Sequence, residues 1–253
     1  EPAQTQLRAQ NLRLRIGVVP YSSTVNVGKQ LLAADMNSIR TEDAEYFHWV
    51  NRRSNGRDNW NFERRAYDLR SYVSGGTFGN RNGHSNNSGV RWKGCVEERA
   101  TINTITGNDS RNAPPVGAND LDIDMLPGWD ESTQWQPYIF DPLNENPNTY
   151  CPSEVTLLDE LDSYDIEQIV GELDPQGSTY HDIGMIWGAR LISGGGVFGS
   201  DNPSTYNGRP VNRHIIYMTD GTMSAPVNSC ARTFFGYCLS STANYVYAYS
   251  GYG

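Results

Sequence analysis

The hydrophobic pattern of residues 177–190 predicts a loop that leads into an amphipathic helix. Gly177 and Ser178 interrupt the pattern that precedes them. The apolar residues that then recur at helical spacing are Ile183, Ile186, Trp187 and Leu191. Gly184 and Gly188 lie one turn apart, although glycine costs a helix about 1 kcal/mol relative to alanine. We therefore expect the glycine face of this helix to pack closely against a sheet.

Two short apolar runs predict buried strands. In Leu12–Val19, aliphatic residues first alternate with arginines and then become continuous, and Pro20 ends the run. The run 214–221 is too short for a helix and finishes with an Asp-Gly pair. In a parallel α/β sheet, ligands bind at the carboxyl ends of the strands, where Asp220 would lie. The Asp220 carboxylate and the Thr179 hydroxyl are hard oxygen donors, so we take them as candidate ligands for Mg²⁺, Ca²⁺ or Mn²⁺.

Two further segments have helical patterns. Residues 1–10 have the pattern of the end of an amphipathic helix, with Ala3 and Leu7 on one side. Residues 155–173 carry an apolar stripe between many acidic residues, and an Asp-Pro pair follows, so we expect a helix there. The stripe consists of Leu157, Leu158, Leu161, Ile166, Ile169, Val170 and Leu173.

Residues 29–150 show no lasting helical period after residues 29–34. Short apolar and aromatic runs alternate with glycine, asparagine and proline, which indicates short strands and surface loops. Aliphatic residues are scarce in this region, so we expect most of its aromatic side chains to form a small core of their own. The alternative is a platform that stacks on glycans or contacts a protein, with Trp60, Trp129 and Trp135 as candidates.

Three polar motifs have both a structural and a functional interpretation. Ser22, Ser23 and Thr24 follow the first strand, but no glycine-rich loop or lysine accompanies them, so we expect turn-forming hydroxyls rather than a phosphate site. Asp120–Asp124 alternates acidic with aliphatic residues, which on a strand gives three carboxylates one face. We expect that face to be the solvent side of an edge strand rather than a calcium site. The Glu-Glu-Arg run at residues 97–99 is interpreted as a structural ion-pair cluster.

Composition restricts the class of protein more than its fold. The 253 residues are enough for one large domain or two small ones, and many of them are Gly, Asn, Ser and Tyr, as in loop-rich secreted or surface proteins. The formal net charge of −9 argues against nucleic acid or an anionic membrane as the main partner and suits divalent cations. No stretch has the length of a transmembrane helix, and no signal peptide is visible. Because a helical pattern is already under way at residue 1, we expect a fragment or processed form, with any export signal or membrane anchor upstream.

A family resemblance rests on specific segments. Residues 177–190 and 214–221 resemble the second and third elements of the metal-ion-dependent adhesion site of a von Willebrand factor A domain. The TadG-like proteins of bacterial tight-adherence (Flp) pilus systems have similar amino-acid sequences in three segments, which correspond here to Thr179–Leu191, Val19–Gly28 and Cys95–Arg99. These segments are spread over most of the chain. The first metal motif of the A-domain family, Asp-x-Ser-x-Ser, is absent from this sequence.

The resemblance implies an α/β fold with a doubly wound, Rossmann-type sheet of the von Willebrand factor A type. Residues 1–28 and 151–253 would form parts of that domain, and residues 29–150 would be a long insertion, mostly strands and loops. It also implies that a central strand and three metal ligands precede residue 1. Residues 1–253 should then not fold alone, and we expect the missing strand to come from the same protein. With Thr179 and Asp220 as its only ligands, Mg²⁺ or Ca²⁺ should bind weakly, because water supplies most of the coordination sphere.

Four cysteines allow three disulfide pairings. Cys230 and Cys238 flank a short aromatic loop and are expected to pair, which leaves Cys95 to pair with Cys151. The extracytoplasmic location that the resemblance implies supports disulfides, because oxidising compartments preserve them. The alternative is four buried free thiols in a cytosolic protein.

The sequence favours a binding role over catalysis. It contains no Gly-x-Ser-x-Gly, His-Glu-x-x-His or phosphate-loop motif, and the adjacent His181 and Asp182 diverge on a helix, so they cannot act on each other as a relay. By the resemblance, the protein would be a periplasmic, cell-surface or secreted bacterial module, not an enzyme, that binds other pilus or cell-surface proteins through a metal ion. The alternative is a structural subunit of a surface layer or extracellular fibre that packs through its aromatic insertion.

Overall fold

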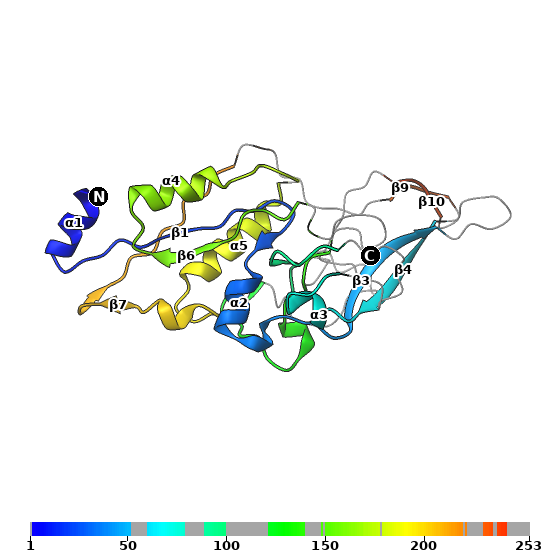
Figure 1. Ribbon diagram of the computed structural model, residues 1–253, viewed down its shortest axis with the longest axis horizontal. Coiled ribbons are helices and arrows are strands. Elements are labelled where there is room, and N and C mark those ends of the chain that lie inside the picture. The colour runs from blue at the N-terminus through cyan, green and yellow to red at the C-terminus, as the bar shows by residue number, and fades with distance from the viewer. Residues whose placement is uncertain are drawn as a thin grey trace.

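The structure is a computed structural model that describes residues 2–51, 60–78, 89–99, 121–139, 148, 150–177, 179–219, 221, 230–234 and 237–241 (Figure 1). For residues 2–3, 45–51, 60–65, 230–234 and 237–241, the backbone alone is described. The elements are α1 (Pro2–Ala9), β1 (Ile16–Val18), β2 (Val25–Asn26), α2 (Gly28–Ala34), η1 (Met36–Ser38), β3 (Ala44–Asn51), β4 (Trp60–Tyr67), α3 (Arg70–Val73), β5 (Cys95–Val96), η4 (Glu131–Thr133), β6 (Thr156–Asp159), α4 (Ser163–Gly171), α5 (His181–Ile192), η5 (Gly199–Asp201), β7 (Thr205–Tyr206), β8 (Arg209–Pro210), β9 (Cys230–Phe234) and β10 (Tyr237–Ser241). Among the described helices, none is both long and apolar enough to cross a membrane.

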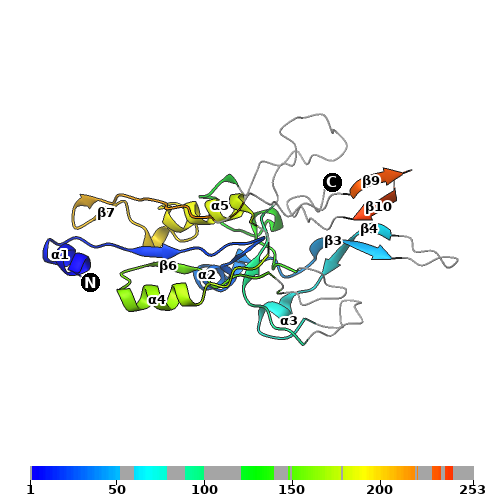
Figure 2. The same cartoon turned by 90° about the horizontal axis from the view of Figure 1, so that it is seen from above.

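The strands described here pair two by two. β1 pairs with β6, β2 with β5, β3 with β4, β7 with β8 and β9 with β10, and all five pairings are antiparallel. In Figure 2 the β1–β6 pair lies between helices α4 and α5, so helices flank it on two sides. That layering is compatible with an α/β fold. The doubly wound, von Willebrand factor A-type sheet stays a prediction, since these five pairings include no parallel pair.

The expected helix over residues 155–173 is wrong in its first half. Residues 156–159 form β6, and Thr156 and Asp159 pair with Val18 and Ile16 of β1. Helix α4 begins after Asp162, whose carboxylate accepts a hydrogen bond from the Asp165 N–H at 2.9 Å. The Asp165 carboxylate accepts one from the Asp162 N–H at 3.0 Å, which completes a capping box. The aliphatic stripe therefore runs across two elements, β6 and α4, and the capping box marks the boundary between them.

The expected strand at 214–221 is also wrong over residues 214–219. This segment runs as an extended stretch that is not assigned as a strand (Figure 2). No backbone–backbone hydrogen bond in the described part of the chain involves residues 212–219. The side chains of Ile216 and Met218 are 86% and 79% exposed. An apolar run becomes a strand only beside a hydrogen-bonded neighbour, and this segment has none among the described residues.

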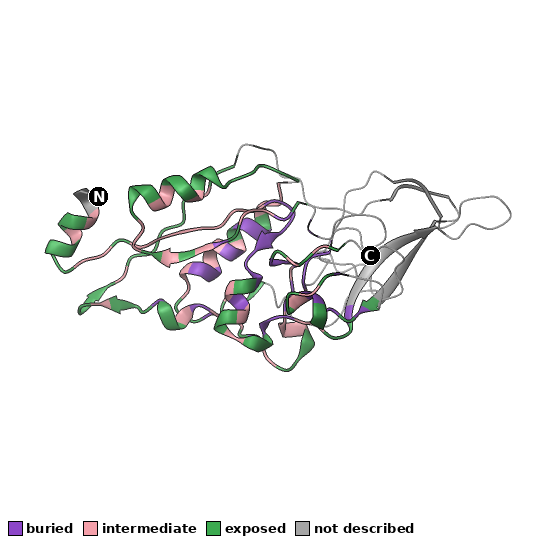
Figure 3. Cartoon of the chain, in the orientation of Figure 1, coloured by how far each residue is buried: buried purple, intermediate pink, exposed green. Residues whose placement is uncertain are grey.

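Helix α5 lies at the centre of the main core, where Figure 3 shows a concentration of buried residues. That core contains Val25, Val27, Leu31, Ile39, Val96, Trp135, Val155, Ile183, Trp187, Leu191 and Phe198. Its glycine face packs closely, as expected, but against side chains rather than a sheet. A Cβ atom on Gly184 would come within 2.6 Å of Tyr21 Cγ, and one on Gly188 would lie 3.8 Å from Ile215. The close approach of Tyr21 therefore requires glycine at position 184.

The region 29–150 contributes both to the main core and to separate buried clusters. A second cluster holds Ala44, Tyr67, Leu69, Tyr72, Phe78 and Ile139, so part of the region has a core of its own, as expected. Leu31, Ile39, Val96 and Trp135, in contrast, belong to the main core with α5. In addition, β2 pairs with β5 of this region. The segment is thus integrated into the fold rather than appended to it.

One of the two expected disulfides lies within the described side chains, and the structure confirms it. Cys95 and Cys151 are bonded, with 5.8 Å between their Cα atoms and 56 residues of sequence separation. In the β9–β10 hairpin, the register sets Cys230 opposite Ser241 and Cys238 opposite Thr233. The side chains of Cys230 and Cys238 lie outside the described part of the chain, so their pairing stays a prediction.

Candidate functional site

Three segments meet at the N-terminus of α5: the loop after β1, the start of the helix, and the end of the extended segment after β8. The Tyr180 N–H donates to the Ser22 carbonyl at 3.0 Å and fixes the helix start against the loop. The Ser22 hydroxyl donates to the carbonyl of Tyr150 at 2.6 Å, and the Thr24 hydroxyl to that of Val96 at 2.5 Å. Ser22 and Thr24 therefore hold the backbone at Tyr150 and Val96, as expected for structural hydroxyls.

The two candidate metal-ligand segments converge here. A Cβ atom on Gly221 would lie 3.1 Å from the Thr179 hydroxyl oxygen, so the two residues are in contact. Asp220, the other candidate ligand, precedes Gly221 and lies outside the described residues. The structure thus brings the helix start beside the end of the expected strand, as metal binding by Thr179 and Asp220 requires. It leaves the position of the carboxylate open.

Two tyrosines and a histidine cover this junction. The rings of Tyr21 and Tyr217 stack with their centroids 5.7 Å apart, and their hydroxyl oxygens are 2.6 Å apart. The edge of the His181 ring meets both, at centroid distances of 6.4 and 5.6 Å. His181 Nε2 lies 3.2 Å from the Thr219 hydroxyl. The pKa of Tyr217 is raised above its ordinary value, mainly because its hydroxyl is removed from water and also because it is hydrogen-bonded with Tyr21.

The chemistry of this junction is that of neutral oxygen donors. The Thr219 hydroxyl lies beside the His181 imidazole, the Tyr21 and Tyr217 hydroxyls meet each other, and the Thr179 hydroxyl lies beside Gly221. Among the described residues, no group of three or more His, Cys, Asp or Glu side chains is arranged to hold a metal ion. A divalent cation here would depend on the carboxylate of Asp220 for charge and on water for most of its coordination sphere.

The Glu-Glu-Arg run at 97–99 makes hydrogen bonds to distant parts of the chain, and the ion-pair cluster expected there stays a prediction. Arg99 is 1% exposed and donates hydrogen bonds to the carbonyls of Asp122 and Met125, each at 2.9 Å. The Glu98 carboxylate accepts a hydrogen bond from the Tyr180 hydroxyl at 2.5 Å. Burial raises the pKa of Glu97 well above its ordinary value. This run therefore joins the start of α5 to the region around residue 125.

The three candidate tryptophans differ in position. Trp135 is 1% exposed, so its proposed contact with a glycan or protein is wrong. Its ring lies 5.1 Å from that of Trp187, and the guanidinium carbons of Arg99 and Arg190 lie 4.3 and 5.4 Å from it. Trp129 is 90% exposed and remains a candidate contact. The side chain of Trp60 lies outside the described part of the chain.

The expected edge strand at Asp120–Asp124 is wrong for the described residues 121–124, none of which lies in a strand and of which 123–124 form a turn. The Asp122 carboxylate accepts a hydrogen bond from the Asp124 N–H at 3.1 Å, which stabilises the turn. The Asp124 carboxylate accepts one from the Ser193 hydroxyl. The alternation of acidic and aliphatic residues therefore does not correspond to two faces of a strand.

Sequence reasoning did not single out Tyr21 and Tyr217 as neighbours. They lie 196 residues apart, and nothing local to either marks the contact. The available signal was Gly184, because a glycine inside a helix indicates a close neighbour, although it does not identify that neighbour.

Comparison with known proteins gives no assignment. A scan against models of protein families, and searches of curated proteins and of solved structures, find no match to this chain.

Proposed function

We propose that this protein is an extracytoplasmic, metal-dependent interaction module that acts in adhesion or in the assembly of a pilus or related surface structure. Its cation would sit at the N-terminus of α5, between the Thr179 hydroxyl and the Asp220 carboxylate. The partners would be other pilus or cell-surface proteins, and the location periplasmic, cell-surface or secreted.

The observation that carries this proposal is the contact between Thr179 and Gly221. Two segments more than 40 residues apart, each chosen from the sequence for its oxygen donor, come together at a helix start. Backbone N–H groups at such a start favour an anionic group, here a carboxylate of the protein or of a partner. A cation at this position would bridge the protein to an acidic residue of its partner.

Two further properties support the proposed location and partners. The Cys95–Cys151 disulfide is of the kind that persists in oxidising compartments and is rare in cytosolic proteins. The net charge of −9 disfavours nucleic acid, so a protein partner bound through a cation is the better match.

A second candidate function, a structural subunit of a surface layer or fibre, is favoured by Trp129. An indole that is 90% exposed, in the region between residues 29 and 150, supplies the kind of aromatic anchor that dominates many protein interfaces. Packing between copies through this side chain would need no cation.

One experiment distinguishes the two candidate functions. Fluorescently labelled protein is incubated with bacterial cells that carry tight-adherence pili, in the presence of Mg²⁺ or of EDTA, and sedimentation velocity is recorded in the same buffers. The proposed function predicts cell binding that EDTA abolishes and that the substitution Asp220→Asn removes. Self-assembly that EDTA leaves unchanged and that Trp129→Ala removes would instead identify a structural subunit.

A further inference from the structure

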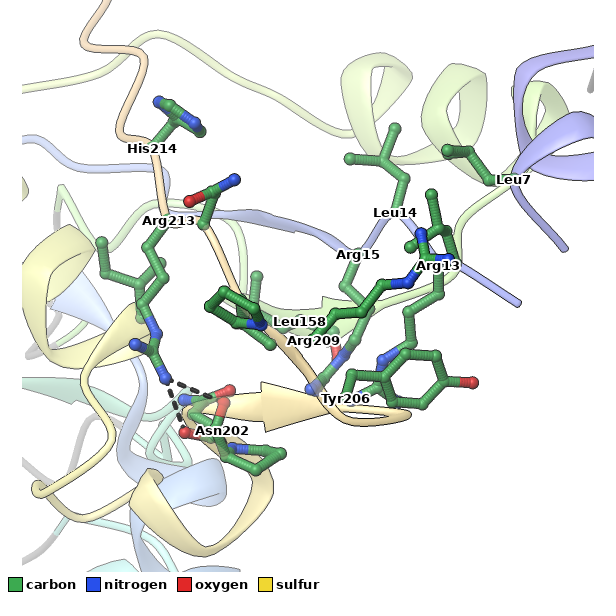
Figure 4. A pocket seen from close by; sticks show the side chains of 16 residues that line it. Leu7, Arg13, Leu14, Arg15, Leu158, Asn202, Tyr206, Arg209, Arg213 and His214 are labelled. Atoms are coloured by element: carbon green, nitrogen blue, oxygen red, sulfur yellow. Dashed lines mark hydrogen bonds between the residues drawn. The ribbon is translucent and has the colours of Figure 1, made fainter. Parts of the chain in front are cut away.

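A cavity of about 290 Å³ lies beside α1 and β7, at one end of the molecule (Figures 1 and 4). Residues 12–15, which lead into β1, line one side, and residues 209–214, which include β8, line another. Leu158 of β6 and Ile192 of α5 also line it. Ile192 is the last residue of α5 and lies about 16 Å along the helix from His181, so the cavity is separate from the candidate metal site.

Hydrogen bonds hold the walls of this cavity together. The Asn207 side chain, at the turn between β7 and β8, donates to the Asn11 carbonyl at 3.1 Å and ties that hairpin to the segment that leads into β1. The Asn202 side chain, 5% exposed, donates to the carbonyls of Leu191 and Ser193 at 2.8 and 3.1 Å. It thereby joins the start of the hairpin to the end of α5. The cavity is therefore preformed, as most small-molecule sites are.

Arginines are concentrated in the lining. Arg13, Arg15, Arg209 and Arg213 are four of the 20 lysines and arginines in the chain. The described residues that line the cavity include no Asp or Glu, although the protein has a net charge of −9. Clustered like charges repel one another, and an anion between them relieves the repulsion.

Two of these arginines stabilise the fold. Arg15 donates to the Leu158 carbonyl through Nε and Nη2, at 3.1 and 2.6 Å, and forms an ion pair with Asp201. Arg213 donates through Nη2 to two backbone carbonyls, at 2.8 and 3.0 Å (dashed lines in Figure 4). These contacts within the protein account for both positions, so neither arginine requires a ligand.

The other two arginines have no hydrogen-bond acceptor in the part of the chain that the structure describes. The guanidinium carbon of Arg13 lies 4.1 Å from the centre of the Tyr206 ring, so stacking holds this group in place. The side chain of Arg209 makes no hydrogen bond or ion pair with a described residue, and Figure 4 shows it among the side chains of the lining. A stacked guanidinium keeps the N–H groups along its edge available to a carboxylate or phosphate.

Aliphatic side chains form much of the remaining lining. Leu7 of α1, Leu12, Leu158, Ile192 and Val211 line the cavity, and each is partly buried. An inorganic anion would contact the arginines and leave this apolar surface in water. A ligand that fits both parts of the lining carries an aliphatic chain on its anionic group. The volume is at the lower end of the range for ligand sites, about 300–1,000 Å³, so it suits a small molecule.

We propose that this cavity binds a small soluble oxyanion that carries a short aliphatic chain, a carboxylate or a phosphate monoester. The oxyanion accepts hydrogen bonds from Arg13 and Arg209, and the chain packs on Leu12 and Leu158. This ligand site goes beyond the proposed function, because it depends neither on a cation nor on the N-terminus of α5.

The test uses octanoate as the probe and measures its binding to the protein by a saturation-transfer NMR titration. We expect a Kd of about 1 mM or lower. Arg209→Gln removes a charged donor at an exposed position, where the fold does not depend on it, and should weaken binding about tenfold. Arg91→Gln, at an exposed arginine outside the lining, is the matched control and should bind octanoate as the wild type does. Equal weakening in the two variants would indicate general charge attraction and would overturn the proposal, as would the absence of binding.

Ligand analogues test the two halves of the site separately. Butyrate should bind more weakly than octanoate, by about fourfold for each methylene group that the cavity no longer buries. Octanol, which lacks the charge, should bind at least about tenfold more weakly than octanoate. Equal affinity for octanol and octanoate would leave apolar contact alone, and equal affinity for butyrate and octanoate would leave the arginines alone. Either result overturns the proposed combination.

The source of the anionic group is tested with two further probes. Octyl phosphate, titrated in the same way, identifies the preferred oxyanion, since tighter binding than octanoate assigns a phosphate and weaker binding a carboxylate. Sedimentation with vesicles of phosphatidylglycerol tests a membrane lipid as the source. Retention of the protein on these vesicles that Arg209→Gln removes would place the anion in a membrane and would overturn the assignment of a soluble ligand.

Discussion

The ring of Tyr21 lies directly on the backbone of Gly184, where a Cβ atom would come within 2.6 Å of the ring carbon Cγ. This contact places the loop after β1 against the start of α5 and holds Tyr21 beside Tyr217. Any larger residue at position 184 must displace the ring. The geometry of the candidate site therefore depends on a glycine that is not itself part of it.

The two helix glycines should respond in opposite ways to alanine. Gly184→Ala should lower the free energy of unfolding by about 1–3 kcal/mol, because the ring has no space to retreat without repacking. Gly188→Ala adds a methyl group at ordinary contact distance from Ile215 and should raise it by up to about 1 kcal/mol, through better helix propensity. Urea denaturation of both variants measures the difference. Equal effects would mean that Tyr21 does not occupy this position.

Two tryptophans give a second matched pair. Trp135→Ala should destabilise the protein by about 3–5 kcal/mol, since it empties a buried space between Trp187 and two arginines. Trp129→Ala should change stability by less than about 0.5 kcal/mol, because its side chain is 90% exposed. Thermal unfolding of the two variants checks the assignment. A stability loss at Trp129 would contradict its exposed position.

Breaking the Cys95–Cys151 disulfide should cost about 4 kcal/mol on the chain-entropy model, because the bond closes a long loop. The double substitution Cys95→Ser with Cys151→Ser tests this by denaturant unfolding against the oxidised protein. Mass spectrometry of non-reduced peptides identifies the bond directly and also reports on Cys230 and Cys238. Alkylation of Cys95 in the native, unreduced protein would contradict the bond.

Because of Glu97, the free energy of unfolding should fall as the pH rises. Burial raises the pKa of this carboxyl in the folded state, so the folded protein holds its proton more tightly than the unfolded chain does. The stability that follows is complete below about pH 4.3, the ordinary glutamate pKa, and is lost as the pH rises through the raised pKa of the folded state. Glu97→Gln removes the ionisation and should be more stable than the wild type at pH 8, with a smaller difference at pH 4. The midpoints of urea unfolding of both proteins across this pH range measure the effect. A stability difference that grows as the pH falls would contradict a raised pKa of Glu97.

The sequence predicts most accurately where local chemistry alone determines the structure. Helix α5 and the close contact at Gly184 follow from residue spacing and glycine cost. The aliphatic stripe at residues 155–173 is misleading because Asp162 and Asp165 form a capping box, where a strand ends and a helix begins. Leucines at positions 157 and 158 do not reveal this boundary, since a strand and a helix both tolerate them. The segment 214–219 has the composition of a strand, but pairing depends on a neighbour, which no local pattern reveals.

In the candidate site, too, the sequence predicts the features that depend on local chemistry and misses those that depend on packing. The positions of Thr179 and of the Asp-Gly pair at element ends indicate oxygen donors, and the structure brings Thr179 to Gly221. The tyrosine pair was not foreseen, because a contact between residues 196 positions apart depends on how the elements pack. The burial of Trp135 is beyond local sequence patterns for the same reason, since its arginine and tryptophan neighbours come from other parts of the chain.

The most direct test of the central claim is the affinity of residues 1–253 for Mg²⁺, measured by isothermal titration calorimetry. Thr179→Val and Asp220→Asn are compared with the wild type, and Thr205→Val, at an exposed threonine in β7, serves as the control. Binding should be weak, with a Kd of about 1 mM or higher, and it should be lost in Asp220→Asn, weakened in Thr179→Val and unchanged in Thr205→Val. Micromolar binding by a monomer that unfolds cooperatively, or binding that survives both site substitutions, would contradict it.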